Sequence, residues 1–179
     1  MAFAFVFPGQ GSQSVGMMAA YGDSPIIRST FDEASATLGQ DLWQLVVDGP
    51  AELLAQTVNT QPLMLTSAIA AYRLWLEKGG RIPAVVAGHS LGEYSALVAA
   101  GVIDFKDAVP LVRLRAAAMQ EAVPVGTGAM AAILNLDDER IREACVEAEA
   151  EVGNGEVVAP VNFNAPGQTV IAGSRAAVE

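Results

Sequence analysis

The stretch Gly88-His89-Ser90-Leu91-Gly92 constrains the fold of this chain more than any other. An apolar run precedes it and an alanine-rich segment follows, which predicts a strand over 84–88 and a helix over 91–101. Gly-x-Ser-x-Gly between a strand and a helix is the pattern of a nucleophile elbow, in which the serine stands on a sharp, strained turn. The sequence therefore predicts Ser90 as an exposed nucleophile, and the alternative is a tight turn with an incidental serine.

An oxyanion that develops next to such a serine needs N–H donors nearby. Leu91 follows the serine at the start of the predicted helix, where unpaired N–H groups and the helix dipole favour negative charge. A second donor must come from another loop, and Gly9-Gln10-Gly11 follows a predicted strand over 3–7. This loop matches neither the dinucleotide-binding pattern nor the Walker pattern, so phosphate binding is disfavoured. A simple strand exit stays open as the alternative.

His89 is the only histidine of the chain. A general base must lie within hydrogen-bond reach of the serine hydroxyl. The residue just before the nucleophile of an elbow points away from that hydroxyl. His89 is therefore interpreted as a packing or supporting residue and not as the base.

Arg113 and Arg115 lie on a predicted helix over 105–122, in which Pro110 is expected to introduce a kink or delay the start. Because the two arginines are two residues apart, their side chains point to different faces, so that one can reach solvent while the other turns inward. An inward arginine is costly unless it meets a carboxylate. That carboxylate can belong to an internal Asp or Glu, which the residues alone favour, or to an acidic substrate.

The other predicted elements are helices in the first part of the chain and strands with two helices in the last part. Helices are predicted over 25–38, with Ser24 as N-cap, and over 51–56 and 61–78. Later come strands over 129–136, 157–163 and 169–172, a helix capped by Asp137, and a last helix that begins at 174. Cys145 lies on the apolar stripe of the helix after Asp137 and is interpreted as a core residue.

Charge and composition exclude several classes of protein. The formal net charge of −10 argues against sequence-independent binding to nucleic acid, and no apolar run approaches the ~20 residues that span a bilayer. A single cysteine excludes an internal disulfide and suits a reducing cytosol.

Residues 125–179 carry 3 basic and 9 acidic side chains (net −6), against 7 and 11 (net −4) in the longer segment 1–124. With the Pro/Gly punctuation at 124–128, this shift predicts a domain boundary there.

Five segments occur in an order that points to one family. They are FVFPGQGSQ (5–13), TQP (60–62), GHSLGEYSA (88–96), GTGAM (126–130) and PVNFNAPGQ (160–168). Together they closely resemble malonyl-CoA:acyl carrier protein transacylases of bacterial fatty-acid synthesis, a family related to polyketide acyltransferase domains. The resemblance covers the whole chain and implies an α/β fold with two parts. Residues 1–124 would be the N-terminal part of an α/β-hydrolase-like parallel-sheet domain, and 125–179 an inserted ferredoxin-like α+β subdomain without its last helix and strand.

The resemblance also assigns roles by position. Ser90 is implied to become malonylated, and the backbone N–H groups of Gln10 and Leu91 to form the oxyanion hole. Arg115 is implied to bind the free malonyl carboxylate, which favours the substrate over an internal acid as its partner. The implied reaction is ping-pong: Ser90 takes the malonyl group from malonyl-CoA, and the phosphopantetheine thiol of acyl carrier protein then removes it.

Three further residues and the partners follow from the same resemblance. Gln61 is implied as an active-site polar residue, and Asn162 and Asn164 as residues that line the cleft and touch the coenzyme A or carrier arm. No metal and no cofactor are implied, because the coenzyme A thioester is a substrate. The implied partners are malonyl-CoA, acyl carrier protein and the C-terminal remainder of the same protein, without nucleic acid or membrane, in the cytoplasm.

The catalytic histidine of the family lies beyond the small subdomain, and no counterpart occurs in this sequence. Ser90 is therefore expected to be poised but poorly activated in residues 1–179 alone. Two alternatives to a transacylase part stay open: a non-catalytic fragment or interaction module, and a generic Gly-x-Ser-x-Gly esterase or thioesterase.

Overall fold

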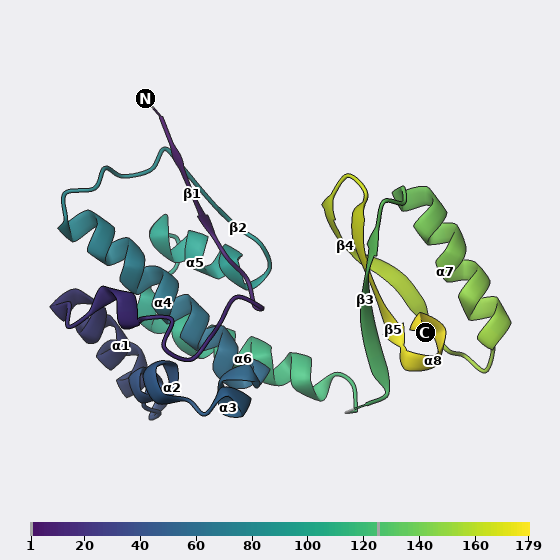
Figure 1. Ribbon diagram of the computed structural model, residues 1–179, viewed down its shortest axis with the longest axis horizontal. Helices are drawn as coiled ribbons and strands as arrows, with labels where there is room; N and C mark the ends of the chain where they lie inside the picture. Colours follow the sequence, from purple (N-terminus) through teal and green to yellow (C-terminus); the bar gives the residue numbers. More distant parts are fainter. Residues whose placement is uncertain (1, 125) are drawn as a thin grey trace. The chain divides into compact units, whose positions relative to one another are not determined.

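The computed structural model describes residues 2–124 and 126–179 (Figure 1). The chain divides into two compact units, Met1–Gln120 and Glu121–Glu179, which are considered one at a time. The predicted boundary after residue 124 lies four residues beyond this division, and Val125 is outside the described residues. None of the described helices is long and apolar enough to cross a lipid bilayer.

A parallel pair of strands forms the sheet of the first unit. β1 (Ala4–Phe7) pairs with β2 (Val85–Gly88), with Ala4 opposite Val85 and Phe7 opposite Gly88. α5 (Leu91–Ala99) follows β2 after a short turn and packs on both strands. The predicted strand, turn and helix around Ser90 are confirmed, although the helix ends two residues before 101. Because the strands are parallel, the loop after β1 and the turn after β2 leave the sheet at the same edge.

The long central helix, α4 (Thr57–Glu77), begins four residues before the predicted 61. Its first turn is held by Thr60, whose hydroxyl donates to the carbonyl of Leu54 at 2.6 Å. Pro62 lies inside the helix, which accommodates it at the loss of one backbone hydrogen bond. The earlier start matters for the site because it places Gln61 inside a buried helical turn and not at a solvent-exposed helix end.

The helices before α4 follow the predictions with one omission. α1 (Pro25–Leu38) has its predicted range and Ser24 is its N-cap residue as predicted, although the Ser24 side chain makes no capping hydrogen bond. α2 (Leu42–Asp48) has no counterpart among the predicted elements. Its buried residues are spaced as on a helix, but seven residues are too few for periodicity alone to identify one. A single 3₁₀ turn (Ala19–Tyr21) precedes α1, and α3 (Ala51–Ala55) is one residue shorter than predicted.

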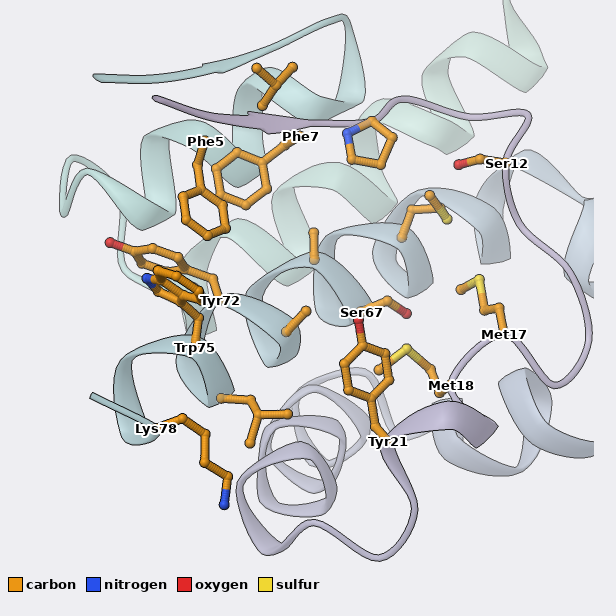
Figure 2. Close-up of a pocket in the computed structure, with 16 residues that line it drawn as sticks. Phe5, Phe7, Ser12, Met17, Met18, Tyr21, Ser67, Tyr72, Trp75 and Lys78 are labelled. Atoms are coloured by element: carbon orange, nitrogen blue, oxygen red, sulfur yellow. The ribbon is translucent and has the colours of Figure 1, made fainter. Parts of the chain in front are cut away.

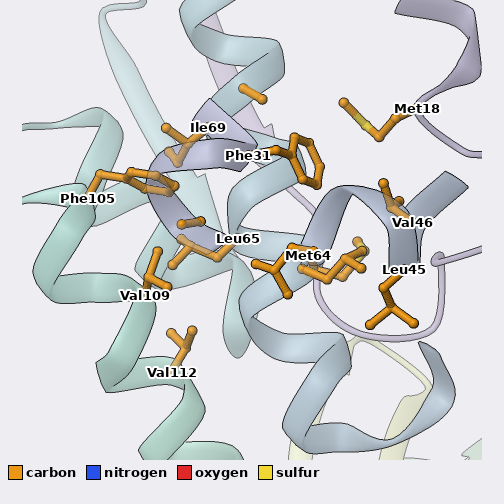
Figure 3. Close-up of a cluster of buried hydrophobic side chains, with 14 of the residues drawn as sticks. Met18, Phe31, Leu45, Val46, Met64, Leu65, Ile69, Phe105, Val109 and Val112 are labelled. Carbon is orange, nitrogen blue, oxygen red and sulfur yellow. The ribbon is translucent and has the colours of Figure 1, made fainter. Parts of the chain in front are cut away.

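The last helix of the first unit, α6 (Phe105–Glu121), starts where it is predicted to start. Pro110 lies inside it on an exposed position and does not delay its beginning. One face of α6 buries Phe105, Val109 and Val112 in the main core. Figure 3 shows these side chains meeting Leu65 and Ile69 of α4, with Phe31 of α1 close by. Each large side chain that is fully buried here stabilises the fold by about 1.5–3 kcal/mol, which fixes the rotation of α6 against α4.

The second unit is a three-stranded antiparallel sheet covered by helices. β3 (Gly128–Leu134), α7 (Asp138–Val152), β4 (Val158–Ala165), β5 (Gln168–Ser174) and α8 (Arg175–Val178) follow one another along the chain, and the sheet order is β3-β5-β4. Asp137 caps α7 as predicted, accepting from the N–H of Arg140 at 2.9 Å. The predicted strand over 129–136 ends at 134, since Asn135 turns into the left-handed region with a φ of 61°.

Cys145 of α7 is buried in the core of this unit against Ile141 and Ile171, as predicted. Burial in this apolar surrounding and the nearby carboxylate of Glu149 raise the pKa of the Cys145 thiol. A thiol whose pKa is raised stays protonated at neutral pH and is a poor nucleophile. Cys145 is therefore a packing residue, and it does not compete with Ser90 for a reactive role.

Candidate active site

The turn between β2 and α5 holds Ser90 at a φ of 53° and a ψ of −112°. A non-glycine residue with positive φ is strained, and such strain persists only where the surrounding structure imposes it. A Cβ on Gly88 would overlap the backbone of Gly92, and a Cβ on Gly92 would overlap the carbonyl of Phe7 at the end of β1. Both glycines are thus required by close backbone approach, and the strained turn presents the Ser90 side chain on the surface.

Substituting Gly92 is expected to be much more damaging than substituting another glycine near the same helix. Gly92→Ala should lower the free energy of unfolding by about 3 kcal/mol or more, because backbone atoms of β1 must move. Gly101, just after α5, has a positive φ of 72° but open space around its Cβ position, so Gly101→Ala should cost only about 1 kcal/mol of backbone strain. Urea unfolding of the three proteins measures both values. Equal costs for the two variants would contradict the close packing of the elbow on β1.

Arg115 of α6 reaches the nucleophile directly. Its Nη2 donates to Ser90 Oγ at 3.0 Å, and its Nη1 donates to Oε1 of Gln61 on α4 at 2.7 Å. The guanidinium carbon also lies 5.7 Å from the ring centroid of Tyr94, one turn along α5 from the serine. Because arginine only donates, Ser90 Oγ accepts this bond and its own proton stays free for transfer to a base. The three predicted residues Ser90, Arg115 and Gln61 are therefore brought together.

The other arginine of α6 differs from the prediction. Arg113 does not reach freely into solvent: it is half-buried and donates through Nη2 to Oε1 of Gln40, which in turn donates to Asn59 at 3.0 Å. Its Nε is buried without a partner among the described residues, and burial lowers the pKa of the Arg113 guanidinium. The ion pairs in the described residues use other arginines, so the internal Asp or Glu expected for an inward arginine is absent there. Both arginines meet neutral carboxamides instead.

The loop after β1 lies against the elbow. A Cβ on Gly9 would come within 3.1 Å of the His89 carbonyl oxygen, and the Gln10 side chain donates to Thr57 Oγ1 at the start of α4 at 3.4 Å. Gln10 and Leu91 are thus on neighbouring segments at the same edge of the sheet. His89 itself is exposed, which corrects its interpretation as a packing residue, and no hydrogen bond in the described part of the chain joins it to Ser90.

Asn162 and Asn164 belong to the second unit, on β4. Asn162 pairs with Val170, on the face of the sheet opposite to Ile171, which packs under α7. Asn162 is half-buried and Asn164, at a register shift of the strand, is exposed. The open sheet face that carries Asn162 is also apolar, with Met130 and Leu134 exposed on β3.

Two residues that contact Arg115 or Gln61 have no role in the sequence-based site. They are Tyr94, four residues after Ser90, and Met119, four residues after Arg115. The sequence signal that could have found both is helical spacing, since residues four apart share one face of a helix. No group of three or more His, Cys, Asp or Glu side chains suited to a metal occurs within the described ranges.

A serine on a strained strand–helix turn, with an arginine on its hydroxyl, is an arrangement suited to acyl transfer, and comparison with known proteins agrees. Residues 4–179 match the acyl transferase domain, and the chain belongs to that family. The most similar curated relatives include the malonyl CoA-acyl carrier protein transacylase of Escherichia coli K12, which is 64% identical over 178 residues. The resemblance stated from the sequence is thereby confirmed.

Solved structures give the same grouping. An acyl-carrier-protein S-malonyltransferase from Burkholderia pseudomallei is 62% identical, with a TM-score of 0.93 over 99% of this chain. A malonyl-transacylase solved in complex with its type II PKS acyl-carrier protein is 57% identical, also with a TM-score of 0.93 over 99% of this chain. The chain spans 56% of the length of the Escherichia coli relative and 57% of each of these two structures. The mixed α/β architecture, with parallel and antiparallel sheets, is thus shared with these proteins.

Proposed function

We propose that residues 1–179 form the nucleophile-bearing part of a transacylase that moves malonyl groups from malonyl-CoA to acyl carrier protein. The observation that carries this proposal is the 3.0 Å hydrogen bond from Arg115 to Ser90 Oγ, made by a guanidinium with no carboxylate partner among the described residues. A positive charge next to a nucleophile favours an acyl group that carries its own negative charge. Malonyl is such a group, and acetyl is not.

The proposed chemistry has two halves. Ser90 Oγ attacks the thioester carbonyl, its proton passes to a base, and the carbonyl oxygen becomes an oxyanion held by the backbone N–H groups of Gln10 and Leu91. The C–S bond then breaks, coenzyme A takes the proton back from the base and leaves as the thiol, and malonyl-Ser90 remains. The phosphopantetheine thiol of acyl carrier protein then gives its proton to the base and attacks this ester. The malonyl thioester of the carrier protein forms, and Ser90 Oγ leaves with the proton. When the substrate is bound, the Arg115 guanidinium releases Ser90 Oγ and binds the malonyl carboxylate.

The general base is assigned to the histidine that the family resemblance places beyond the matched residues. His89 is not proposed for this role, because none of the hydrogen bonds in the described residues joins His89 to Ser90 Oγ. No cofactor enters the reaction, since the thioester itself is the activated species. The proposed location is the cytoplasm.

The two compact units correspond in this proposal to two parts of the complete enzyme. We assign the first to an α/β-hydrolase-like domain, supported by the parallel strands and the elbow at their carboxyl edge. We assign the second to a ferredoxin-like subdomain, supported by its β-α-β-β order and its β3-β5-β4 sheet. Asn162 and Asn164 are proposed to contact the coenzyme A or carrier arm.

A groove on the first unit supports the proposal that a further part of the enzyme packs against this unit. Figure 2 shows the aromatic side chains Phe5, Phe7, Tyr72 and Trp75 around this hollow, which has a volume of about 620 Å³. The strands beside it are also open, since Val6 and Val85 are 74% and 60% exposed. Apolar surface of this kind is normally covered. We propose that the C-terminal remainder of the transacylase covers it.

A chimera tests the proposed function. Residues 1–179 are joined to the part of the Escherichia coli relative that follows its matched segment, and radiolabelled malonyl-CoA is supplied with holo-acyl carrier protein. We expect malonyl transfer to the carrier protein, with much weaker transfer from acetyl-CoA. Residues 1–179 alone should label slowly or not at all; rapid labelling at Ser90 would show that His89 acts as the base. A folded chimera that hydrolyses thioesters or simple esters without loading the carrier protein would favour the esterase or thioesterase alternative.

A further inference from the structure

The carboxamide of Gln61 is held from both ends by one face of α6. Its Oε1 accepts from Arg115 Nη1 at 2.7 Å, and its Nε2 donates to the sulfur of Met119 at 3.3 Å. Gln61 is fully buried, so water does not offer its amide a substitute partner. Arg115 and Met119 are four residues apart on α6. Both contact Gln61, which lies 54 residues from Arg115 and 58 residues from Met119 in the sequence.

The direction of this carboxamide decides how Arg115 is held. With Oε1 towards α6, Gln61 accepts from one guanidinium nitrogen and leaves the other on Ser90 Oγ. With the amide rotated by half a turn, Nε2 would face the guanidinium, and two donors would meet without an acceptor. The sulfur of Met119 is a weak acceptor, yet it is the one recorded for the Gln61 Nε2 group in the described residues. The Met119 sulfur therefore favours the Gln61 rotamer in which Oε1 accepts from Arg115.

We propose that Met119 is a positioning residue for the acyl carboxylate site: its sulfur orients the Gln61 carboxamide, and Gln61 orients Arg115. This inference rests on the proposed function for its effect on malonyl transfer, while the contact itself does not depend on that function. Met119 is 50% exposed and contributes little to the main core. Its substitution can therefore change the orientation of Gln61 without emptying a core position.

Two substitutions separate orientation from packing. Met119→Leu keeps an apolar side chain of similar volume but removes the acceptor, whereas Met119→Gln changes the polarity but offers a carbonyl oxygen at similar reach. In the chimera, Met119→Leu is expected to lower kcat/KM for malonyl-CoA about tenfold and for acetyl-CoA less than about twofold, because a buried donor loses its partner. Met119→Gln is expected to recover malonyl-CoA activity to within about threefold of the parent.

The relative malonyl-CoA activity of the leucine and glutamine variants decides between an orienting and a packing role for Met119. A packing role for Met119 predicts that leucine is tolerated better than glutamine, and that order, or a malonyl-to-acetyl ratio unchanged by leucine, would overturn the inference. A chimera with Met119 intact that loads no carrier protein would contradict the proposed function alone. The contact is read directly in the chimera by NMR, as a nuclear Overhauser effect between the Gln61 side-chain amide protons and the Met119 methyl group. Its absence in the folded chain would refute the contact.

Discussion

Ser90→Ala is expected to reduce malonyl transfer by the chimera at least ~1,000-fold, because removal of a catalytic nucleophile leaves only the contribution of substrate binding and the oxyanion hole. Alanine lacks the Oγ that attacks the thioester, so the acyl-enzyme cannot form. The measurement is the transfer rate at saturating malonyl-CoA, together with the amount of label bound to the protein after rapid quenching. Labelled protein at the parent level would place the nucleophile elsewhere and refute the elbow assignment.

Ser90→Gly is the matched control for folding. Ser90 has a φ of 53°, a conformation that glycine adopts without strain. We therefore expect Ser90→Gly to be as inactive as Ser90→Ala but more stable than the parent by about 1 kcal/mol. Loss of activity with a gain in stability cannot come from misfolding. A glycine variant less stable than the parent would mean that the Ser90 hydroxyl stabilises the turn by more than its strain costs.

Arg115→Ala is expected to remove the preference for malonyl over acetyl groups. Truncating one member of a close charge pair costs about 2–5 kcal/mol, so kcat/KM for malonyl-CoA should fall by ~100-fold or more while that for acetyl-CoA changes little. Arg115→Lys should be intermediate, since an ammonium keeps the charge but not the fork that serves two acceptors. Steady-state kinetics with both thioesters measure the ratio directly.

Arg113→Ala is the control for Arg115 on the same helix. Arg113 bonds Gln40 and makes no hydrogen bond to Ser90, so its removal can lower stability but should leave the malonyl-to-acetyl ratio unchanged. A ratio that moves equally in both variants would indicate a general disturbance of α6. A ratio that moves in neither would refute the carboxylate role of Arg115 and support a generic esterase or thioesterase.

Local signals predicted most of the elements. The strand, elbow and helix around Ser90 were predictable because glycine spacing and the change from an apolar run to a helix act over a few residues. The start of α4 was not, because Thr57 and Val58 enter the helix through Thr60, whose hydroxyl bonds the carbonyl of Leu54 in the preceding helix. α2 was missed for a related reason: its short apolar face is recognisable only when the core that it covers is known.

The sequence by itself determined the family, the nucleophile elbow and the presence of two arginines on one helix. The family resemblance implied Arg115, but only the tertiary structure shows why this arginine and not Arg113 meets Ser90. Helical spacing places Arg113 and Arg115 on different faces, but the face that turns to the serine depends on how Val109 and Val112 of α6 pack against α4. That packing also brings Gln61 and Met119 together. Contacts between residues more than fifty positions apart are set by the burial of whole faces, which no local pattern contains.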